Sequence, residues 1–150
     1  MLKKLDKTTE KAVKNRLTLL AQLKASLVPH ARAEEKILYE SLKKSDVKEA
    51  DEIAFEGHEE HGVVDRLFDE LGKTKPADKR WGALMSVLKE SLEHHIEEEE
   101  EELFKKARKS FDTETATEMA EKFTALKKKF VTELKAGKKL KQKPSHSLEK

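Results

Sequence analysis

The spacing of apolar residues is the feature that most constrains the fold of this chain. In its first part, positions on one line recur at alternating steps of three and four: Val13, Leu17, Leu20, Leu23, Leu27, His30, Glu34 and Ile37. Two later lines follow the same rule: Ile53, Gly57, His61, Val64, Phe68 and Leu71, and then Trp81, Met85, Leu88, Leu92, His95, Glu99 and Glu102 or Leu103. Such steps keep side chains on one face of an α-helix. The sequence therefore predicts an all-α helical bundle.

Turn and capping signals divide the chain into four predicted helices, at about residues 8–43, 46–71, 78–109 and 113–136. Thr8 or Thr9 is expected to cap the first helix and Asp46 the second, since short polar side chains accept from free backbone N–H groups. Pro29 lies within the first line and predicts a kink near residues 25–29, or a break into two helices.

Composition limits the kinds of site and the compartment. The chain has no cysteine, which leaves only nitrogen and oxygen ligands for a metal. No apolar run approaches the roughly 18 residues of a membrane span, and the start of the chain has no apolar signal segment. We expect a cytoplasmic protein without a membrane partner.

Charge is unevenly distributed although the formal net charge is only +2. Acidic side chains gather at residues 93–102 and basic ones in the last two dozen residues. We expect one domain at residues 1–136 and a disordered basic tail at 137–150 that includes His146. The tail has no interleaved aromatic residues, so no nucleic acid is expected as a partner.

Two segments repeat one pattern of potential metal ligands. With Leu38-Tyr39 aligned on Leu103-Phe104, His30 falls on His95 and Glu34 on Glu99 without a gap. Each His and Glu are four positions apart, on one face of a helix about 6 Å apart along the axis. The apolar line selects His95 with Glu99 over His94 with Glu98.

A third histidine, His61, lies on the line of the second predicted helix, with His58 one turn earlier on its flank. Taken singly, a glutamate run is usually a solvated face and a lone histidine a core residue. However, buried carboxylates are costly unless they are paired or bind metal, and no Lys or Arg occupies the neighbouring line positions. Two carboxylates and three imidazoles inside a bundle form the type of ligand set that holds paired iron or manganese ions, whereas zinc would use a subset.

The sequence resembles the hemerythrin-like, or HHE cation-binding, domain family. The resemblance covers roughly residues 12–135 and rests on His-Ala-Arg-Ala-Glu-Glu at 30–35, Glu59-Glu60-His61 opening a Val-Val-Asp-Arg-Leu-Phe segment, and His-His-Ile-Glu-Glu-Glu-Glu at 94–100. It implies an up-down four-helix bundle with a non-heme di-iron centre (Fe²⁺/Fe³⁺). The implied metal ligands are His30, Glu34, His61, His95 and Glu99.

The chain departs from the family pattern at its start. Family members usually carry an Asp-His pair some thirty to thirty-five residues before the equivalent of His30, whereas this chain has no earlier histidine. The first ligand-bearing helix is therefore expected to be missing, which predicts an exposed apolar face. We expect self-association as a homodimer across that face, with His58 as a possible substitute ligand; folding of residues 113–136 over the gap, or partial order, are the alternatives.

The resemblance implies a protein that binds dioxygen or another small oxidant, or senses oxygen or iron. An enzyme, namely a di-iron peroxidase or oxidase or one that reacts with nitric oxide, is the second hypothesis. A metal-free structural bundle is the third. Metal analysis and colour separate the third hypothesis from the others, and turnover with peroxide separates the second from the first.

Overall fold

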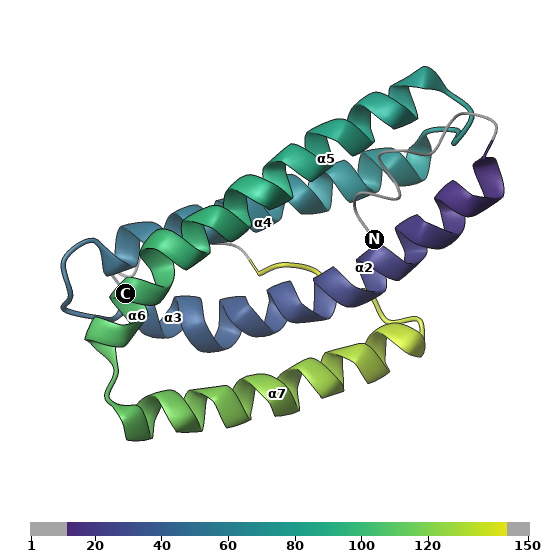
Figure 1. Ribbon diagram of the computed structural model, residues 1–150. Coiled ribbons are helices and arrows are strands. Elements are labelled where there is room, and N and C mark those ends of the chain that lie inside the picture. The colour runs from purple at the N-terminus through teal and green to yellow at the C-terminus, as the bar shows by residue number, and fades with distance from the viewer. Residues whose placement is uncertain (1–11, 144–150) are drawn as a thin grey trace.

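A computed structural model describes residues 12–143, which contain helices and connecting turns but no strand. The elements are α2 (Val13–Glu34), the π-helix η1 (Glu35–Tyr39), α3 (Glu40–Lys43), α4 (Ala50–Lys73), α5 (Lys79–Glu98), the π-helix η2 (Glu99–Leu103), α6 (Phe104–Ser110) and α7 (Thr113–Lys135). Because η1 and η2 continue the helices that flank them, the elements form four long rods (Figure 1). The all-α prediction is confirmed.

Capping explains where several rods begin. The Asp78 side chain accepts from the backbone N–H of Arg80, and the Asp112 side chain accepts from that of Thr115, so both act as N-caps. The predicted start at Asp46 is wrong: α4 begins at Ala50, after Glu49 with a left-handed φ of 67°. A break at Pro29 is also wrong, since α2 continues through it.

The core consists of two clusters of buried side chains at opposite ends of the bundle. One contains Leu20, Leu23, Val64, Phe68, Leu71, Trp81, Met85, Leu88 and Leu92, and the other contains Tyr39, Leu42, Ala50, Ala54 and Leu103. The histidines and carboxylates of the predicted site lie on helices between these clusters. Burial of apolar surface on both sides therefore fixes the helices that carry the ligands.

In the first turns of α2, the buried residue is not the one that the apolar spacing predicts. Leu17 is 51 % exposed, whereas Arg16 is buried. The Arg16 guanidinium lies 4.7 Å from the centre of the Trp81 ring and donates to the Pro76 carbonyl oxygen at 2.6 Å. Stacking on an indole satisfies a buried arginine, which the spacing of apolar residues alone does not reveal.

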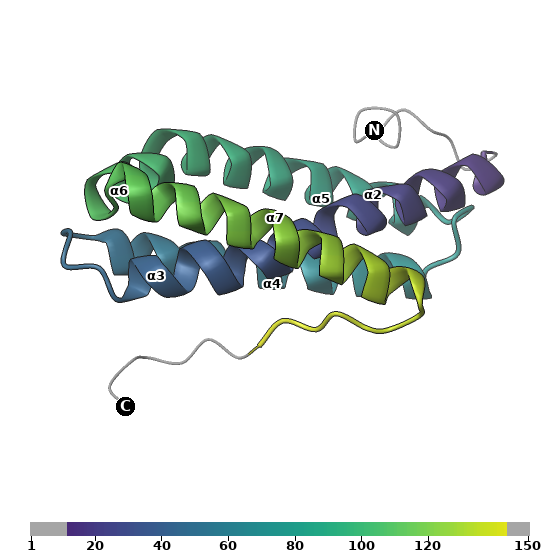
Figure 2. The ribbon, with the colours of Figure 1, turned by 90° about the horizontal axis from the view of Figure 1, so that it is seen from below.

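The last helix, α7, runs along α2 on the side away from α4 and α5 (Figures 1 and 2). None of its side chains is fully buried; Met119, Phe123 and Phe130 are half-buried. Residues 137–143 follow without regular structure. The predicted cap at Thr8 or Thr9, and His146 in the predicted tail, lie outside the described residues.

The described helices are strongly charged along their outer faces. Among residues 12–143, no helix combines the length and the apolar character that crossing a bilayer requires.

Candidate metal centre

Each predicted ligand pair lies where an α-helix changes into a π-helix. The segment η1 starts directly after Glu34, and η2 starts at Glu99. Single π-helical turns occur mostly at functional sites, because the extra residue changes the direction of the side chains that follow. The two sequence repeats thus share a local distortion, although it starts one aligned position later in the first repeat than in the second.

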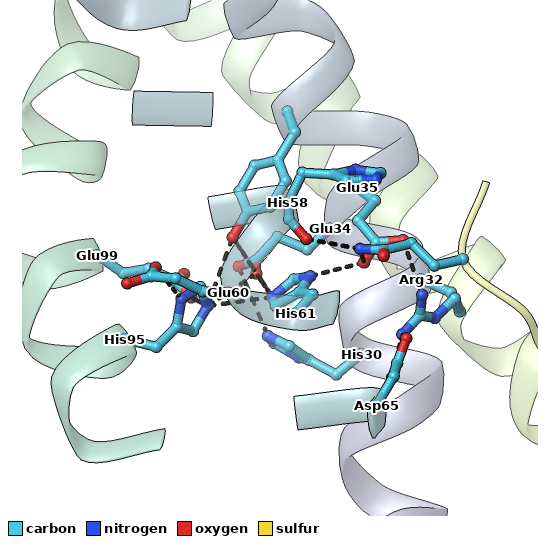
Figure 3. Close-up of polar contacts among 12 residues, drawn as sticks. His30, Arg32, Glu34, Glu35, His58, Glu60, His61, Asp65, His95 and Glu99 are labelled. Atoms are coloured by element: carbon cyan, nitrogen blue, oxygen red, sulfur yellow. Dashed lines mark hydrogen bonds and ion pairs between the residues drawn. The ribbon is translucent and has the colours of Figure 1, made fainter. Parts of the chain in front are cut away.

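Four predicted ligands converge between α2, α4 and α5. One ligand atom from each of Glu34, His61, His95 and Glu99 lies within 4.8 Å of all the others (Figure 3). His61 Nε2 is 3.2 Å from Glu34 Oε1 and 3.1 Å from His95 Nε2, and His95 Nε2 also contacts Glu99 Oε1. Three helices far apart in sequence therefore direct two imidazoles and two carboxylates to one point.

Two further carboxylates orient the histidines. His61 Nδ1 lies 2.7 Å from Glu35 Oε2, and His95 Nδ1 lies 2.8 Å from Glu60 Oε1. Since a carboxylate only accepts hydrogen bonds, each Nδ1 carries the proton and each Nε2 faces the centre. A carboxylate behind a histidine fixes its tautomer and makes the other nitrogen a better metal ligand. The sequence analysis did not assign this role, although Glu35 and Glu60 each adjoin a predicted ligand.

Tyr39 is a further residue of the centre that sequence analysis missed. Its side chain is 0 % exposed, and its hydroxyl donates to Glu34 Oε1 at 3.0 Å. The hydroxyl oxygen of Tyr39 also lies 3.4 Å from the Nε2 atoms of both His61 and His95. The only sign of Tyr39 in the sequence is an aromatic residue five positions after Glu34. Its counterpart in the second repeat, Phe104, is 38 % exposed, so the repeat does not predict a buried aromatic residue at this position.

Gly57 gives the Tyr39 ring its space, and Gly57→Ala is expected to lower the free energy of unfolding by about 1–3 kcal/mol. A Cβ atom at Gly57 would meet the Tyr39 ring and hydroxyl at 2.7 Å, so the phenol must move. Gly72→Ala is the matched control in the same helix, because its Cβ meets nothing within 4 Å. Urea unfolding measures both; equal stability of the two variants would contradict the packing described here.

Protons hold the centre together when metal is absent. Burial alone raises the pKa of Glu34, but hydrogen bonds from His30, His61 and His95 outweigh it and hold that pKa well below its usual value. Burial and the neighbouring Glu34 carboxylate raise the pKa of Glu99 despite the contact from His95. The carboxylates also overcome the effect of burial on His95 and raise its pKa to about 11. A metal ion must therefore displace a proton from His95.

The metal-free protein is expected to lose stability as pH rises above neutrality. His95 titrates at 6.5 when unperturbed and at about 11 in the fold, so its contribution is complete below pH 6.5 and disappears as pH rises through 11. Urea unfolding in chelator should show a loss of about 4 kcal/mol between pH 7 and 10 that His95→Asn abolishes. His94→Asn, at an exposed position, is the control; an unchanged pH profile in His95→Asn would refute the assignment.

The other three histidines of residues 12–143 lie outside the group of four. His30 Nε2 is 3.8 Å from Glu34 Oε2, but its side chain is 45 % exposed and its ring packs on Phe123 of α7. His94 lies on the surface, within 3.6 Å of Glu60 and 3.4 Å of Glu98. His58 is buried and lines a different cavity, next to Glu35.

Three cavities of contrasting character reach the centre. One, of about 220 Å³, is lined by all five predicted ligands and by apolar side chains of α4 and α5. On the side of α4 and η2, a cavity of about 230 Å³ reaches Tyr39, His95 and Glu99 and is otherwise lined largely by glutamates. On the side of α7, a groove of about 880 Å³ reaches His30, Glu34 and Glu99 between apolar side chains that include Phe104, Met119 and Phe123. A cation and an uncharged small molecule thus have separate approaches to the ligand atoms.

The donors fit a metal ion by their chemistry and by their orientation. Imidazole and carboxylate donors suit iron, manganese and zinc. Both Nε2 atoms already face the carboxylates that would share the ion, and the Nδ1 atoms are held from behind. The group can therefore hold a metal cation with little movement of Glu35 and Glu60, the carboxylates behind the histidines.

Comparison with known families agrees with this geometry. Residues 1–107 match the hemerythrin HHE cation binding domain, a match that includes all four converging ligands and ends before α7. Neither the curated proteins nor the solved structures compared with the chain gave a significant match. Since the family match spans well over half of the chain, the protein belongs to the hemerythrin HHE cation-binding domain family.

Proposed function

We propose that this protein is a non-heme di-iron protein that binds dioxygen, or senses oxygen or iron. The observation that carries the proposal is the convergence of Glu34, His61, His95 and Glu99 within 4.8 Å. Two acidic ligands suit a pair of ions, because a carboxylate can bridge ions about 3.5–4 Å apart. Manganese or zinc would use the same donors, so the identity of the metal is part of the proposal.

The metal ligands we propose are His30, Glu34, His61, His95 and Glu99. His30 is included because its ring is near Glu34 and on the groove side. His58 as a substitute ligand remains a prediction from sequence; the cavity that it lines is not one of the three that reach the centre. When bound, iron would supply the redox and oxygen-binding chemistry of the site.

The chain's own residues would prepare the site and control access to it. Glu35 and Glu60 hold the histidine tautomers, and the Tyr39 hydroxyl donates to Glu34 in a fully enclosed position. Burial and the Glu34 and Glu99 charges raise the pKa of Tyr39, so its hydroxyl stays protonated as a donor. A small ligand would enter through the groove, which reaches His30, Glu34 and Glu99.

The acidic cavity supports a cation as the natural occupant of the centre. Its glutamates are Glu49, Glu52, Glu56, Glu60, Glu98, Glu99 and Glu102. A recess lined by one sign of charge concentrates the opposite ion at its mouth. This negative approach ends at His95 and Glu99, two of the proposed ligands.

The test of function is the optical spectrum of the iron-loaded protein under nitrogen and under air. Reversible oxygen binding predicts a visible absorption band that appears in air and disappears under nitrogen over repeated cycles. The enzyme alternative, a peroxidase or oxidase, is favoured by the width of the groove beside the centre. It predicts steady turnover with peroxide and an organic reductant; a loaded protein with neither property would refute both functions.

Self-association is expected across the groove, which exposes apolar side chains on a protein in water. Phe104→Asp should convert a dimer into a monomer, because Phe104 is 38 % exposed and lines the groove. Val87→Asp is the control: Val87 is 48 % exposed but lies away from the groove, on α5. Molar mass from light scattering decides, and a wild-type monomer would contradict the prediction.

A further inference from the structure

A fourth cavity lies beside the metal centre, on the side of Glu35 away from His61. It has a volume of about 240 Å³ and lies between the α2–η1–α3 rod, α4, the end of α7 and residues 139–143. At about 30 Å³ per water molecule, this space exceeds the needs of one or two waters and admits a small polyatomic ion with part of its hydration shell.

The lining of this cavity is strongly basic. Six cationic side chains line it, namely Arg32, Lys36, Lys43, Lys139, Lys141 and Lys143, against the carboxylates of Glu35 and Glu40. The Arg32 guanidinium is already paired with both oxygens of Asp65 at 2.7 Å, so the five lysines carry the excess of positive charge. Glu35 is already engaged, because its two oxygens contact Arg32, His61 and the Gln142 amide. A chain with a net charge of only +2 thus gathers an excess of positive charge around one recess. Like charges brought together raise the energy of the fold unless an anion lies among them.

Two side chains that line the cavity also have buried polar atoms without a partner. Arg32 Nε and His58 Nδ1 make no hydrogen bond within the described residues, and both side chains are more than nine-tenths buried. The third such atom, Trp81 Nε1, belongs to the distant apolar cluster. The Nε atom of Arg32 always carries a proton, and a buried donor without an acceptor destabilises the fold, so a ligand that brings oxygen acceptors would offset this cost.

Residues 139–143 form one wall of the cavity and are held in place by Gln142. The Gln142 amide donates to Glu35 Oε2 at 2.9 Å and to the His58 carbonyl oxygen at 2.7 Å. This anchor places three lysines of the basic tail at the rim, opposite Lys36 and Lys43. The pocket is therefore assembled by segments about a hundred residues apart in sequence.

We infer that this basic pocket binds a phosphate-sized oxyanion, either free or as the terminal group of a small phosphorylated molecule. The ordinary alternative is a rim of solvated lysines around water. It accounts for the exposed ammonium groups but not for the buried Arg32 Nε donor, which has no acceptor within the described residues. The inference does not depend on which metal the neighbouring centre holds.

Titration of the full-length protein with inorganic phosphate tests the inference, by calorimetry at constant ionic strength with chloride as the reference anion. Lys36→Gln combined with Lys141→Gln should weaken phosphate binding about tenfold, because two rim charges are lost. Lys75→Gln combined with Lys122→Gln removes the same charge from exposed sites outside the pocket and should leave binding within about twofold.

Metal-loaded and chelated protein should bind phosphate alike, because the pocket and the ligand group lie on opposite sides of Glu35. Binding of phosphate to the metal-loaded form alone would place phosphate on the metal and overturn the inference. The inference would also be overturned if phosphate did not bind at all, or if both pairs of lysine substitutions weakened binding equally. Glycerol phosphate is the second probe. Its binding would identify the terminal group of a small ester as the ligand, and binding of inorganic phosphate alone would identify the free ion.

Discussion

Glu99→Ala is expected to abolish two-ion occupancy and to weaken metal binding at least about 100-fold. The Glu99 carboxylate contacts His95 Nε2 and belongs to the group of four converging ligands. Without it, one of the two proposed bridging groups is missing, and His95 loses the partner at its metal-facing nitrogen. Metal per chain, measured by atomic emission after equilibration in excess iron and desalting, gives the result.

Glu98→Ala is the matched control, because it removes the same side chain one position earlier on the same helix. The Glu98 carboxylate lies near His94 on the surface, at 3.4 Å, and is not among the four. The Glu98→Ala variant should therefore retain two metal ions per chain. Equal loss in both variants would show that the His94–Glu98 pair holds metal and that the chosen pair is wrong.

Removal of metal is expected to lower the melting temperature by about 10–15 °C. A ligand present at a thousand times its dissociation constant stabilises the fold by about 4 kcal/mol, and a domain of this size shifts by about 2–4 °C per kcal/mol or slightly more. Metal is expected to stabilise the fold because Glu34 and Glu99 are buried close together. In the metal-free protein, only protons and hydrogen bonds from histidines offset the negative charge of these carboxylates.

Differential scanning calorimetry of metal-loaded and chelated protein at pH 7 measures this shift. The Glu99→Ala variant should show a much smaller difference between the two preparations. An unmoved transition after prolonged chelation would mean that the carboxylates are satisfied without metal, which is the structural-bundle hypothesis.

The sequence predicted the long-range part of the fold and most of the centre because both depend on helical periodicity. His61, His95 and Glu99 each continue a line of apolar residues, and the structure brings their ligand atoms together with Glu34. The choice of His95 over its neighbour rested on the same periodicity, and the structure has His95 buried and His94 exposed.

Features set by side-chain contacts between helices could not be derived from periodicity. Tyr39 turns inward because η1 changes the register and Gly57 on α4 leaves space for the ring. His30 and His95 are equivalent in the sequence repeat, yet one faces α7 and the solvent while the other faces Glu60. The roles of Glu35 and Glu60 depend on histidines from other helices, His61 and His95, whose position opposite them periodicity does not give.

The measurement that tests the central claim most directly is the metal content of the protein purified without added metal or chelator. The account predicts about two transition-metal ions per chain, mainly iron, bound tightly enough to survive desalting. Protein that is fully folded, carries no metal, and takes up none from excess ferrous iron under nitrogen would contradict it.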